Sequence, residues 1–234
     1  MGFFDRLRNI MASWNNKPVA VDRRNMPIGY GTMVVADEFG NSGELPSPHE
    51  EYFGYGMVLI DDPSAFGDIT EHHRSDRKKA EVKARDLDMD DLLDVSRRIA
   101  SEDIPSFGYI VEKSSPPMGW SEAKRRDRMS DVLDYALDDI LLHAEGNVYA
   151  VVDHHTSYGD KLTGRIVAHS SAGRMVDGDH YNSHEGQFFR ELQTVDHVSH
   201  AIRGRYQFGD PTRTDIMGTR LVVIGPEKRI GRRS

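Results

Sequence analysis

The sequence contains no cysteine in its 234 residues. This absence excludes a disulfide-stabilised scaffold, a thiolate zinc site and a cysteine nucleophile. It is compatible with a reducing compartment, and we expect the protein to be cytoplasmic.

Long hydrophobic runs and an excess of positive charge are absent as well. No apolar run approaches the roughly 18 residues of a membrane helix, and no charged-then-apolar leader is seen, so we expect no membrane span. The 30 Lys and Arg residues against 38 Asp and Glu give a formal net charge of −8. The chain as a whole therefore does not attract nucleic acid, and strong non-specific binding to duplexes is not expected.

The chain divides into a short N-terminal part and one larger domain. Residues 2–14 carry apolar side chains at helical spacing, which predicts an amphipathic helix, and a polar connector with two prolines follows. We expect residues 1–28 to form this helix and connector, and residues 29–234 to form a single domain. The N-terminal helix and the last predicted helix are both candidates for a homodimer interface.

Hydrophobic periodicity predicts alternating strands and helices in the larger domain, which indicates an α/β fold with a mixed sheet flanked by helices. The predicted strands are residues 32–36, 52–60, 107–111, 148–152 and 221–224, and the predicted helices are 89–100, 121–144 and 186–205. Asp88 is the expected N-cap of the first helix, and Gly146 is expected to end the second. Gly54 and Gly56, inside a predicted strand, indicate close packing or a bulge rather than a phosphate-binding loop.

Two of the predicted strands end in an aspartate. MVVA at residues 33–36 precedes Asp37, and VYAVV at residues 148–152 precedes Asp153. Ligands of α/β proteins lie beyond the carboxyl ends of strands, so neighbouring strands of this kind would bring both carboxylates to one mouth. Taken singly, either residue could be an ordinary turn former.

Two further acids are candidates for the same mouth. Asp196 falls on the margin of the apolar stripe of the last helix, where a carboxylate is costly unless a cation or hydrogen bonds satisfy it. Glu81 follows the basic run at residues 77–79 and, by pattern alone, belongs to a solvated charge cluster. Converging carboxylates repel one another unless divalent cations lie between them, and such hard oxygen ligands select magnesium or manganese. Two such ions can drive the hydrolysis of a phosphodiester.

Four short motifs occur in a recognisable order over roughly residues 30 to 210. They are VVADEFGNSG at 34–43, AEVKAR at 80–85, VVD at 151–153 and LQTVD at 192–196. They resemble the D-E-S-G strand end, the E-L/I-K element, the second strand end and the Q-L-A-D helix of an uncharacterised prokaryotic family, catalogued as domain of unknown function 3800. Phe39 stands where that family usually has serine, and Thr194 and Val195 replace its leucine and alanine.

That family is regarded as ribonuclease-H-like, so the resemblance implies a ribonuclease-H-like mixed β-sheet flanked by α-helices. It also implies a four-carboxylate site for two ions, Mg²⁺ or Mn²⁺. Asp37 would bridge the ions, Glu81 would hold one of them, and Asp153 and Asp196 would complete the cluster. The expected activity is that of a metal-dependent nuclease acting on nucleic acid, with RNA and DNA both open as substrates.

Three other residues have expected roles at this site. Glu38 follows Asp37 on a strand and would point to the opposite face if the strand stays regular, so it is a reserve metal ligand. Lys83 is a candidate for contacting the scissile phosphate or for pairing with an acid. His154 flanks a proposed ligand and could position the attacking water or assist the leaving group.

Two alternatives remain open at this point. VDHH at residues 152–155 matches the D-H-H strand end of the manganese phosphoesterases named after it, which act on small phosphates. Those enzymes also need an early strand ending in a D-x-D signature, and ADEF at residues 36–39 does not supply it. The domain could instead be a catalytically inactive ribonuclease-H-like module that binds a partner, although an inactive module has no chemical reason to retain four acids.

Overall fold

The computed structural model describes residues 31–40, 51–71, 73, 82–112, 122–144, 146–153, 176–181 and 189–224. The predicted N-terminal helix and its connector lie outside these residues. Within the described part of the chain, no helix combines the length and the apolar character that a bilayer span requires.

The described strands form one six-stranded mixed sheet in the order β5-β4-β1-β2-β3-β6. Its strands are β1 (Thr32–Phe39), β2 (Tyr52–Ile60), β3 (Ser106–Glu112), β4 (Val148–Asp153), β5 (Val176–Tyr181) and β6 (Arg220–Ile224). The strands β1, β2 and β3 are antiparallel, whereas β4 runs parallel to β1, β5 parallel to β4, and β6 parallel to β3. The predicted mixed sheet is therefore confirmed.

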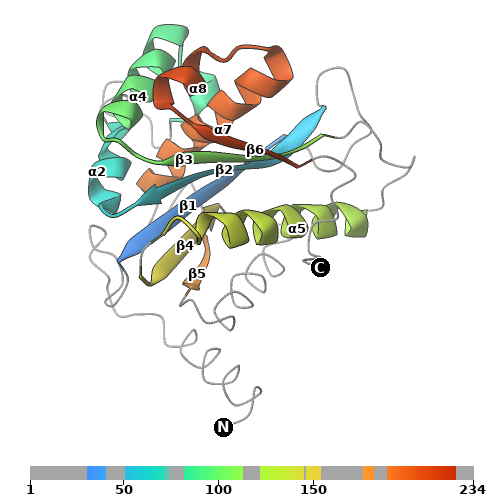
Figure 1. The fold of residues 1–234 in the computed structure, drawn as a ribbon. Helices are drawn as coiled ribbons and strands as arrows, with labels where there is room; N and C mark the ends of the chain where they lie inside the picture. Colours follow the sequence, from blue (N-terminus) through green and yellow to red (C-terminus); the bar gives the residue numbers. More distant parts are fainter. Residues whose placement is uncertain are drawn as a thin grey trace, which may run out of the picture.

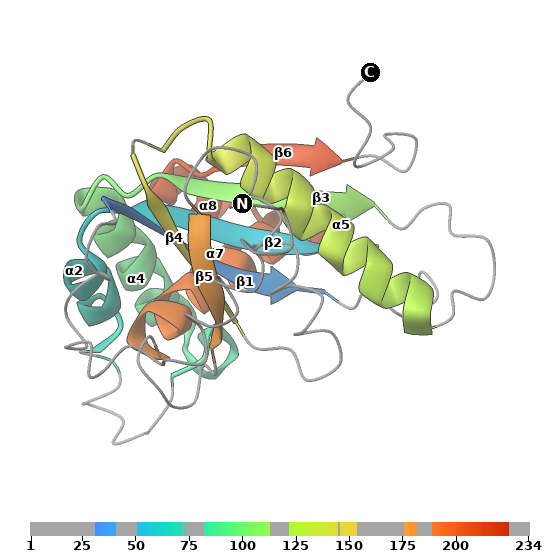
Figure 2. The same cartoon turned by 90° about the horizontal axis from the view of Figure 1, so that it is seen from below.

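Helices cover both faces of this sheet (Figure 1). They are α2 (Pro63–Asp68), the short 3₁₀ helix η1 (Ala84–Asp86), α4 (Met89–Ser101), α5 (Glu122–Ile140), α7 (Phe189–Phe208) and α8 (Thr212–Met217). Helix α5 crosses one face obliquely (Figure 2), while α2, α4, α7 and α8 lie over the other. The sheet is thus the middle layer of three.

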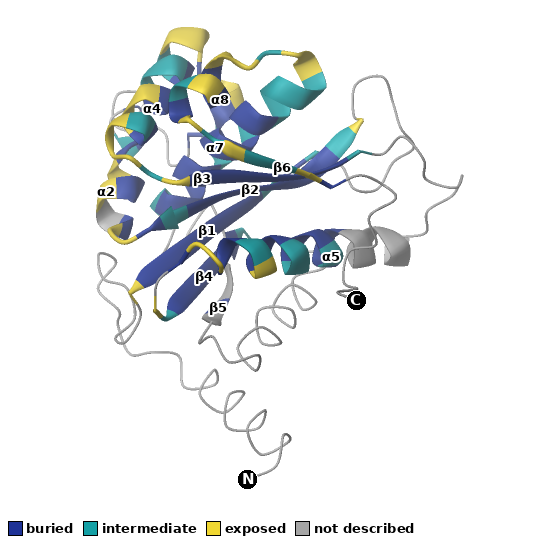
Figure 3. Cartoon of the chain, viewed as in Figure 1, coloured by how far each residue is buried: buried dark blue, intermediate teal, exposed yellow. Residues whose placement is uncertain are grey.

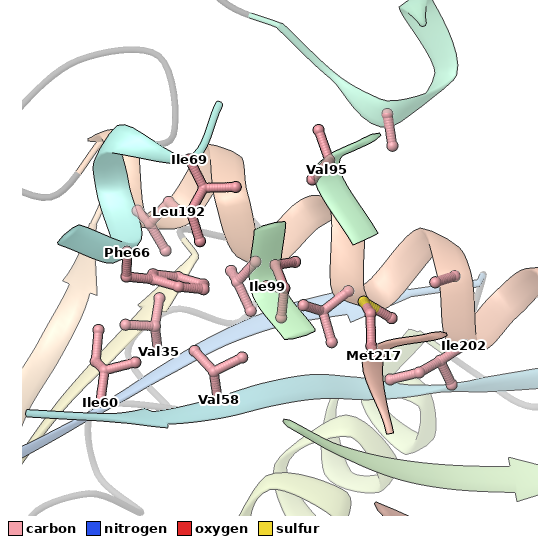
Figure 4. Close-up of a cluster of buried hydrophobic side chains, with 14 of the residues drawn as sticks. Val35, Val58, Ile60, Phe66, Ile69, Val95, Ile99, Leu192, Ile202 and Met217 are labelled. Atoms are coloured by element: carbon pink, nitrogen blue, oxygen red, sulfur yellow. The ribbon is translucent and has the colours of Figure 1, made fainter. Parts of the chain in front are cut away.

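Alternate residues of each central strand feed two separate hydrophobic cores. Val34 and Ala36 of β1 pack with the buried residues of α5, whereas Met33 and Val35 pack with those of α7. In the second core Val35 points toward Phe66 of α2 (Figure 4). The buried residues line the strands and the inner sides of the helices (Figure 3). It follows that odd-numbered side chains of β1 lie on the α7 face.

The predicted elements are found with shifted ends. Residues 52–60 form β2 as expected, and the Asp88 side chain accepts a hydrogen bond from the Asp91 N–H at 3.0 Å, which confirms the predicted cap. Helix α5 ends at Ile140 rather than at residue 144, because the amides of Leu142 and His143 bond to carbonyls only three residues back and tighten the chain into a turn. Helix α7 runs to Phe208 instead of ending at residue 205.

Candidate carboxylate site

Asp37 and Asp153 stand at the carboxyl ends of two adjacent parallel strands. The parallel register pairs Ala36 with Val152, so these two acids are the next residues along β1 and β4. Residues at equal register in parallel strands share a face, and the neighbours Val35 and Val151 both belong to the core under α7. Both acids therefore project from the sheet on the α7 side, at its carboxyl edge.

Helix α7 brings Asp196 to the same edge. The Ser199 hydroxyl donates a hydrogen bond to the backbone carbonyl of Asp37 at 2.9 Å. Asp196 lies three residues earlier on the helix, on the same side as Ser199, and is half-buried. The hydrogen bond of Ser199 thus ties the turn that carries Asp196 to the strand end that carries Asp37.

A glycine permits this close approach. Gly56 of β2 is the register partner of Asp37, and a Cβ atom built on it would lie 2.4 Å from the Ser199 Oγ and 2.8 Å from the Ser199 Cα. Such separations are far below van der Waals contact, so any side chain at residue 56 would force α7 away from the sheet. The close-packing expectation for Gly56 is confirmed.

The segment before η1 lies against the same side of α7. The Ala84 N–H donates to Asp196 Oδ2 at 2.8 Å, and the Val82 N–H donates to Gln193 Oε1 at 3.3 Å. Lys83 lies between these two amides in an extended conformation, with φ −84° and ψ 150°. Its positive charge lowers the pKa of Glu38, so Lys83 is within electrostatic range of the acids at the strand ends.

The charges of the four described acids act on one another. Burial raises the pKa of Asp37 well above its ordinary value, and the negative charges of Asp196, Glu38 and Asp153 raise it further, in that order. Hydrogen bonding from Ser199 opposes this rise. The cluster in the absence of a cation is therefore electrostatically strained, which is the property expected of acids that share a site.

Glu38 belongs to this cluster although strand alternation sets it on the opposite face from Asp37. Burial raises its pKa to about 8, with Asp153 as the next largest cause, while Lys83 opposes the shift. The charge of Glu38 therefore acts across the end of β4 on the same group of residues. The role of Glu38 as a reserve ligand stays a prediction.

The described residues provide oxygen donors of the right chemistry for a hard divalent cation, since all four are carboxylates that repel one another. Among the residues that the structure describes, however, no three Asp, Glu or His side chains form a group arranged to hold a metal ion. Glu81 and His154, which were expected at this site, lie outside the described residues. The described acids therefore bring negative charge to this edge of the sheet, but their side chains are not arranged as the ligands of a metal ion.

Three polar residues at this site were not singled out from the sequence as site residues. Gln193 and Ser199 occur one turn from Asp196 on its own helix, and that helical spacing is the signal that could have identified them. Arg213 of α8 gives no sequence signal. Its buried guanidinium donates to Ser96 Oγ at 3.2 Å, to His200 Nδ1 at 2.8 Å and to the backbone carbonyl of residue 197 at 2.9 Å.

The Arg213 contacts fasten α8 and α4 to the turn of α7 that carries Asp196. Burial lowers the pKa of Arg213 to about 10, and the negative charge of Asp196 opposes that shift. The neighbouring His197 is fully buried, and burial followed by the charge of Arg213 lowers its pKa to about 3. His197 is therefore neutral and makes a poor general acid, whereas Arg213 remains charged within electrostatic range of Asp196.

No protein-family model matches this chain, and no curated protein matches it either. The function is therefore argued from the geometry and electrostatics of the site.

Proposed function

We propose that this chain is a metal-dependent nuclease with a ribonuclease-H-like domain, related to the family whose four motifs it resembles. The observation that carries the proposal is that Asp37 and Asp153 end two adjacent parallel strands while Ser199, one turn from Asp196, bonds to the Asp37 carbonyl, and the charges of Asp153 and Asp196 both raise the pKa of Asp37. These residues come from the ends of two parallel strands and from the helix above them. Three of the four acids implied by the motif order thus act on one another, although up to 159 positions separate them in the sequence.

The donor set favours magnesium or manganese as the bound ions. Asp37, Asp153 and Asp196, together with Glu81, would hold two ions, with Glu38 in reserve. When bound, the two ions would supply an activated water and would stabilise the leaving oxygen of the phosphodiester.

The chain's own residues have defined tasks in this proposal. Ser199 fixes the backbone of Asp37, and the Ala84 N–H fixes one oxygen of Asp196, so both acids keep their orientation while a substrate binds. Lys83 offers a point charge to a non-bridging phosphate oxygen. His154 would hold the attacking water or pass a proton to the leaving oxygen.

Cleavage of a labelled panel tests this proposal directly. The panel contains single-stranded RNA and DNA, both duplexes, a hybrid and a branched junction, each with Mg²⁺, Mn²⁺ or EDTA. We expect metal-dependent cutting by the wild type and a loss in Asp153→Asn larger than the roughly 10- to 100-fold that outer-shell substitutions cost. Asp215→Asn is the matched control, because Asp215 is exposed and its ion pair with Arg205 at 2.6 Å lies on the surface, where such pairs contribute little.

Silence of the wild type on every substrate and with every ion would overturn the nuclease. If the protein cleaves none of these nucleic acids but hydrolyses a small phosphodiester tested beside them, it would instead resemble the D-H-H phosphoesterases. If it cleaves neither, the inactive binding module would be favoured. Equal cutting by wild type and Asp153→Asn would remove Asp153 from the mechanism.

Thermal unfolding tests the repulsion between the carboxylates independently of any cleavage activity. Asp153→Asn removes a negative charge that raises the pKa of both Asp37 and Glu38. In EDTA we therefore expect the variant to be more stable by about 1 kcal/mol, or about 2 to 4 °C in Tm. Mn²⁺ should raise the Tm of the wild type more than that of the variant, since an ion bound by the folded state alone stabilises it.

A further inference from the structure

Gln193 is a buried amide one turn before Asp196 on α7, with only 2% of its surface exposed. Its Oε1 accepts the Val82 N–H at 3.3 Å, and Asp196 Oδ2 accepts the Ala84 N–H at 2.8 Å. Two side chains of one helix face therefore hold two amides of one extended segment. A buried polar side chain is costly unless it is bonded, so its presence here calls for a physical reason.

The geometry of the segment explains what this double contact holds. Val82 and Ala84 are both fully buried, whereas Lys83 between them is only half-buried. In an extended segment, alternate amides point to the same side, so the two bonds to α7 fix the direction in which Lys83 leaves the backbone.

The two hydrogen bonds are made by amides only two residues apart on one extended segment, so a displacement of one amide strains the bond of the other. If Val82 moves away from α7, Ala84 moves with it, and Asp196 loses the donor that orients its carboxylate. Outer-shell residues that orient metal ligands in this way typically contribute 10- to 100-fold to metal affinity.

We propose that Gln193 is a positioning residue of the carboxylate site, which clamps residues 82–84 against α7 and so orients both Asp196 and Lys83. This inference rests on the proposed function, because it assumes that the carboxylates bind divalent ions. Gln193 itself touches neither an ion nor a phosphate in this role.

The chain provides a matched control on the same helix. Gln207 Oε1 accepts the N–H of Tyr52, the first residue of β2, at 3.4 Å. Gln193→Met and Gln207→Met therefore each remove one glutamine-to-backbone hydrogen bond between α7 and another segment. Only the first of these bonds adjoins the carboxylates.

The experiment combines amide hydrogen exchange with a manganese titration followed by thermal unfolding, on the full-length chain. In Gln193→Met we expect faster exchange at Val82 and Ala84, and a rise of about tenfold in the Mn²⁺ concentration that gives half of the Tm increase. Gln207→Met should speed exchange at Tyr52 and leave the Mn²⁺ midpoint unchanged. Gln193→Asn, in which the acceptor is withdrawn by one carbon, should reproduce the Met result and replaces that variant if it does not fold.

Each other outcome has a definite meaning. Unchanged exchange at Val82 overturns the clamp. Faster exchange with an unchanged Mn²⁺ midpoint overturns the positioning role and makes the bond purely structural, as does an equal midpoint shift in Gln207→Met. If the wild type itself shows no Mn²⁺ response, the metal site of the proposed function fails and the positioning role falls with it, whereas the exchange data still report whether the clamp exists.

Discussion

At the scale of single residues, the molecule holds buried carboxylates in two different settings. Asp37 and its neighbours are strained by one another's charge, and a bound cation would relieve that strain. Glu191 of α7 is buried without a comparable cluster, and its Oε2 has no hydrogen-bond partner among the described residues. Burial raises the pKa of Glu191 to about 7, with the charge of Arg190 opposing the shift. The buried charge of Glu191 therefore lowers the stability of the folded state, and Glu191 is not one of the acids of the proposed site.

Glu191→Gln should make the stability of the protein less dependent on pH between about 4.5 and 7. In the unfolded chain Glu191 ionises near 4.5, whereas in the folded state it does so at about 7. Between these values the folded state binds more protons, so stability falls as the pH rises through this window and the cost is fully present above it. We expect the variant to gain on the wild type between pH 4 and pH 8, by about 3 kcal/mol as an upper limit.

Urea unfolding of both proteins at several pH values measures this difference. Asp94, whose pKa is lowered chiefly through Arg98 against an opposing effect of burial, titrates below the window and remains in both proteins, so it cancels in the comparison. A stability difference that does not change between pH 4 and pH 8 would show that Glu191 is not protonated in the folded state at neutral pH.

At the scale of elements, α7 assembles the site. It contributes Asp196 itself, the Ser199 bond to β1 and the Gln193 bond to residue 82. Its approach to the sheet depends on the missing side chain at Gly56. A change in the distance between α7 and the sheet therefore alters the site and the core together.

Gly56→Ala should push helix α7 away from the sheet. Its Cβ would lie 2.8 Å from both the N and the Cα of Ser199, and backbone atoms cannot rotate away as a flexible side chain does. We expect a loss of about 2 to 3 kcal/mol in stability, and a weaker Mn²⁺-induced rise in Tm because Asp196 moves away from Asp37.

Gly204→Ala is the control for this substitution. Gly204 lies on α7, and the nearest atom to its added Cβ would be the Asp210 carbonyl oxygen at 3.8 Å. Alanine is the better helix former, so this variant should gain about 0.5 to 1 kcal/mol and keep its Mn²⁺ response. Thermal unfolding with EDTA and with Mn²⁺ measures both, and a neutral Gly56→Ala would show that α7 does not pack as closely as described.

The elements differ in how well the sequence predicts them, and the reasons are physical. Strands β2 and β4 are central and buried, so their apolar runs are continuous and their bounds are predicted to within one residue. Strand β5 was not predicted, because VDGDHY has no apolar run and takes its place by pairing with β4 at an edge of the described sheet. Helices α2 and α8, of six residues each, are too short to show a period.

The candidate site, too, can be predicted only in part from the sequence. The strand-end positions of Asp37 and Asp153, and the marginal position of Asp196 beside a buried stripe, follow from pattern and agree with the structure. Their electrostatic coupling does not follow from pattern, because it depends on which strands are neighbours. The contribution of Gly56 depends on a helix 143 positions later in the chain, at Ser199.

At the scale of the whole molecule, the formal net charge of −8 opposes the approach of a polyanion. On the proposed function, nucleic acid would bind through ions held by the carboxylates and through the local positive charge of Lys83. The affinity should therefore depend strongly on the divalent ion and only weakly on monovalent salt.

Binding of a labelled single-stranded oligonucleotide by His154→Ala, which keeps every proposed metal ligand while cleavage is slowed, tests this expectation by fluorescence anisotropy. We expect little binding in EDTA, and in Mg²⁺ a slope of log affinity against log salt shallower than about −3, since each phosphate contact adds about −0.7. A steep slope in EDTA would indicate an extended basic track and would contradict a local mode of binding.

The hydrogen bond from Ser199 to the Asp37 carbonyl spans 162 positions of the chain, and that from Ala84 to Asp196 spans 112. A ribosome exposes β1 and its acid early, but the helix that completes the site is among the last described elements to be made. Contacts this distant in sequence cannot form until the later segment has emerged. The carboxylates of the site therefore come together only after most of the described chain has been translated, and on the proposed function the nuclease would be inactive until then.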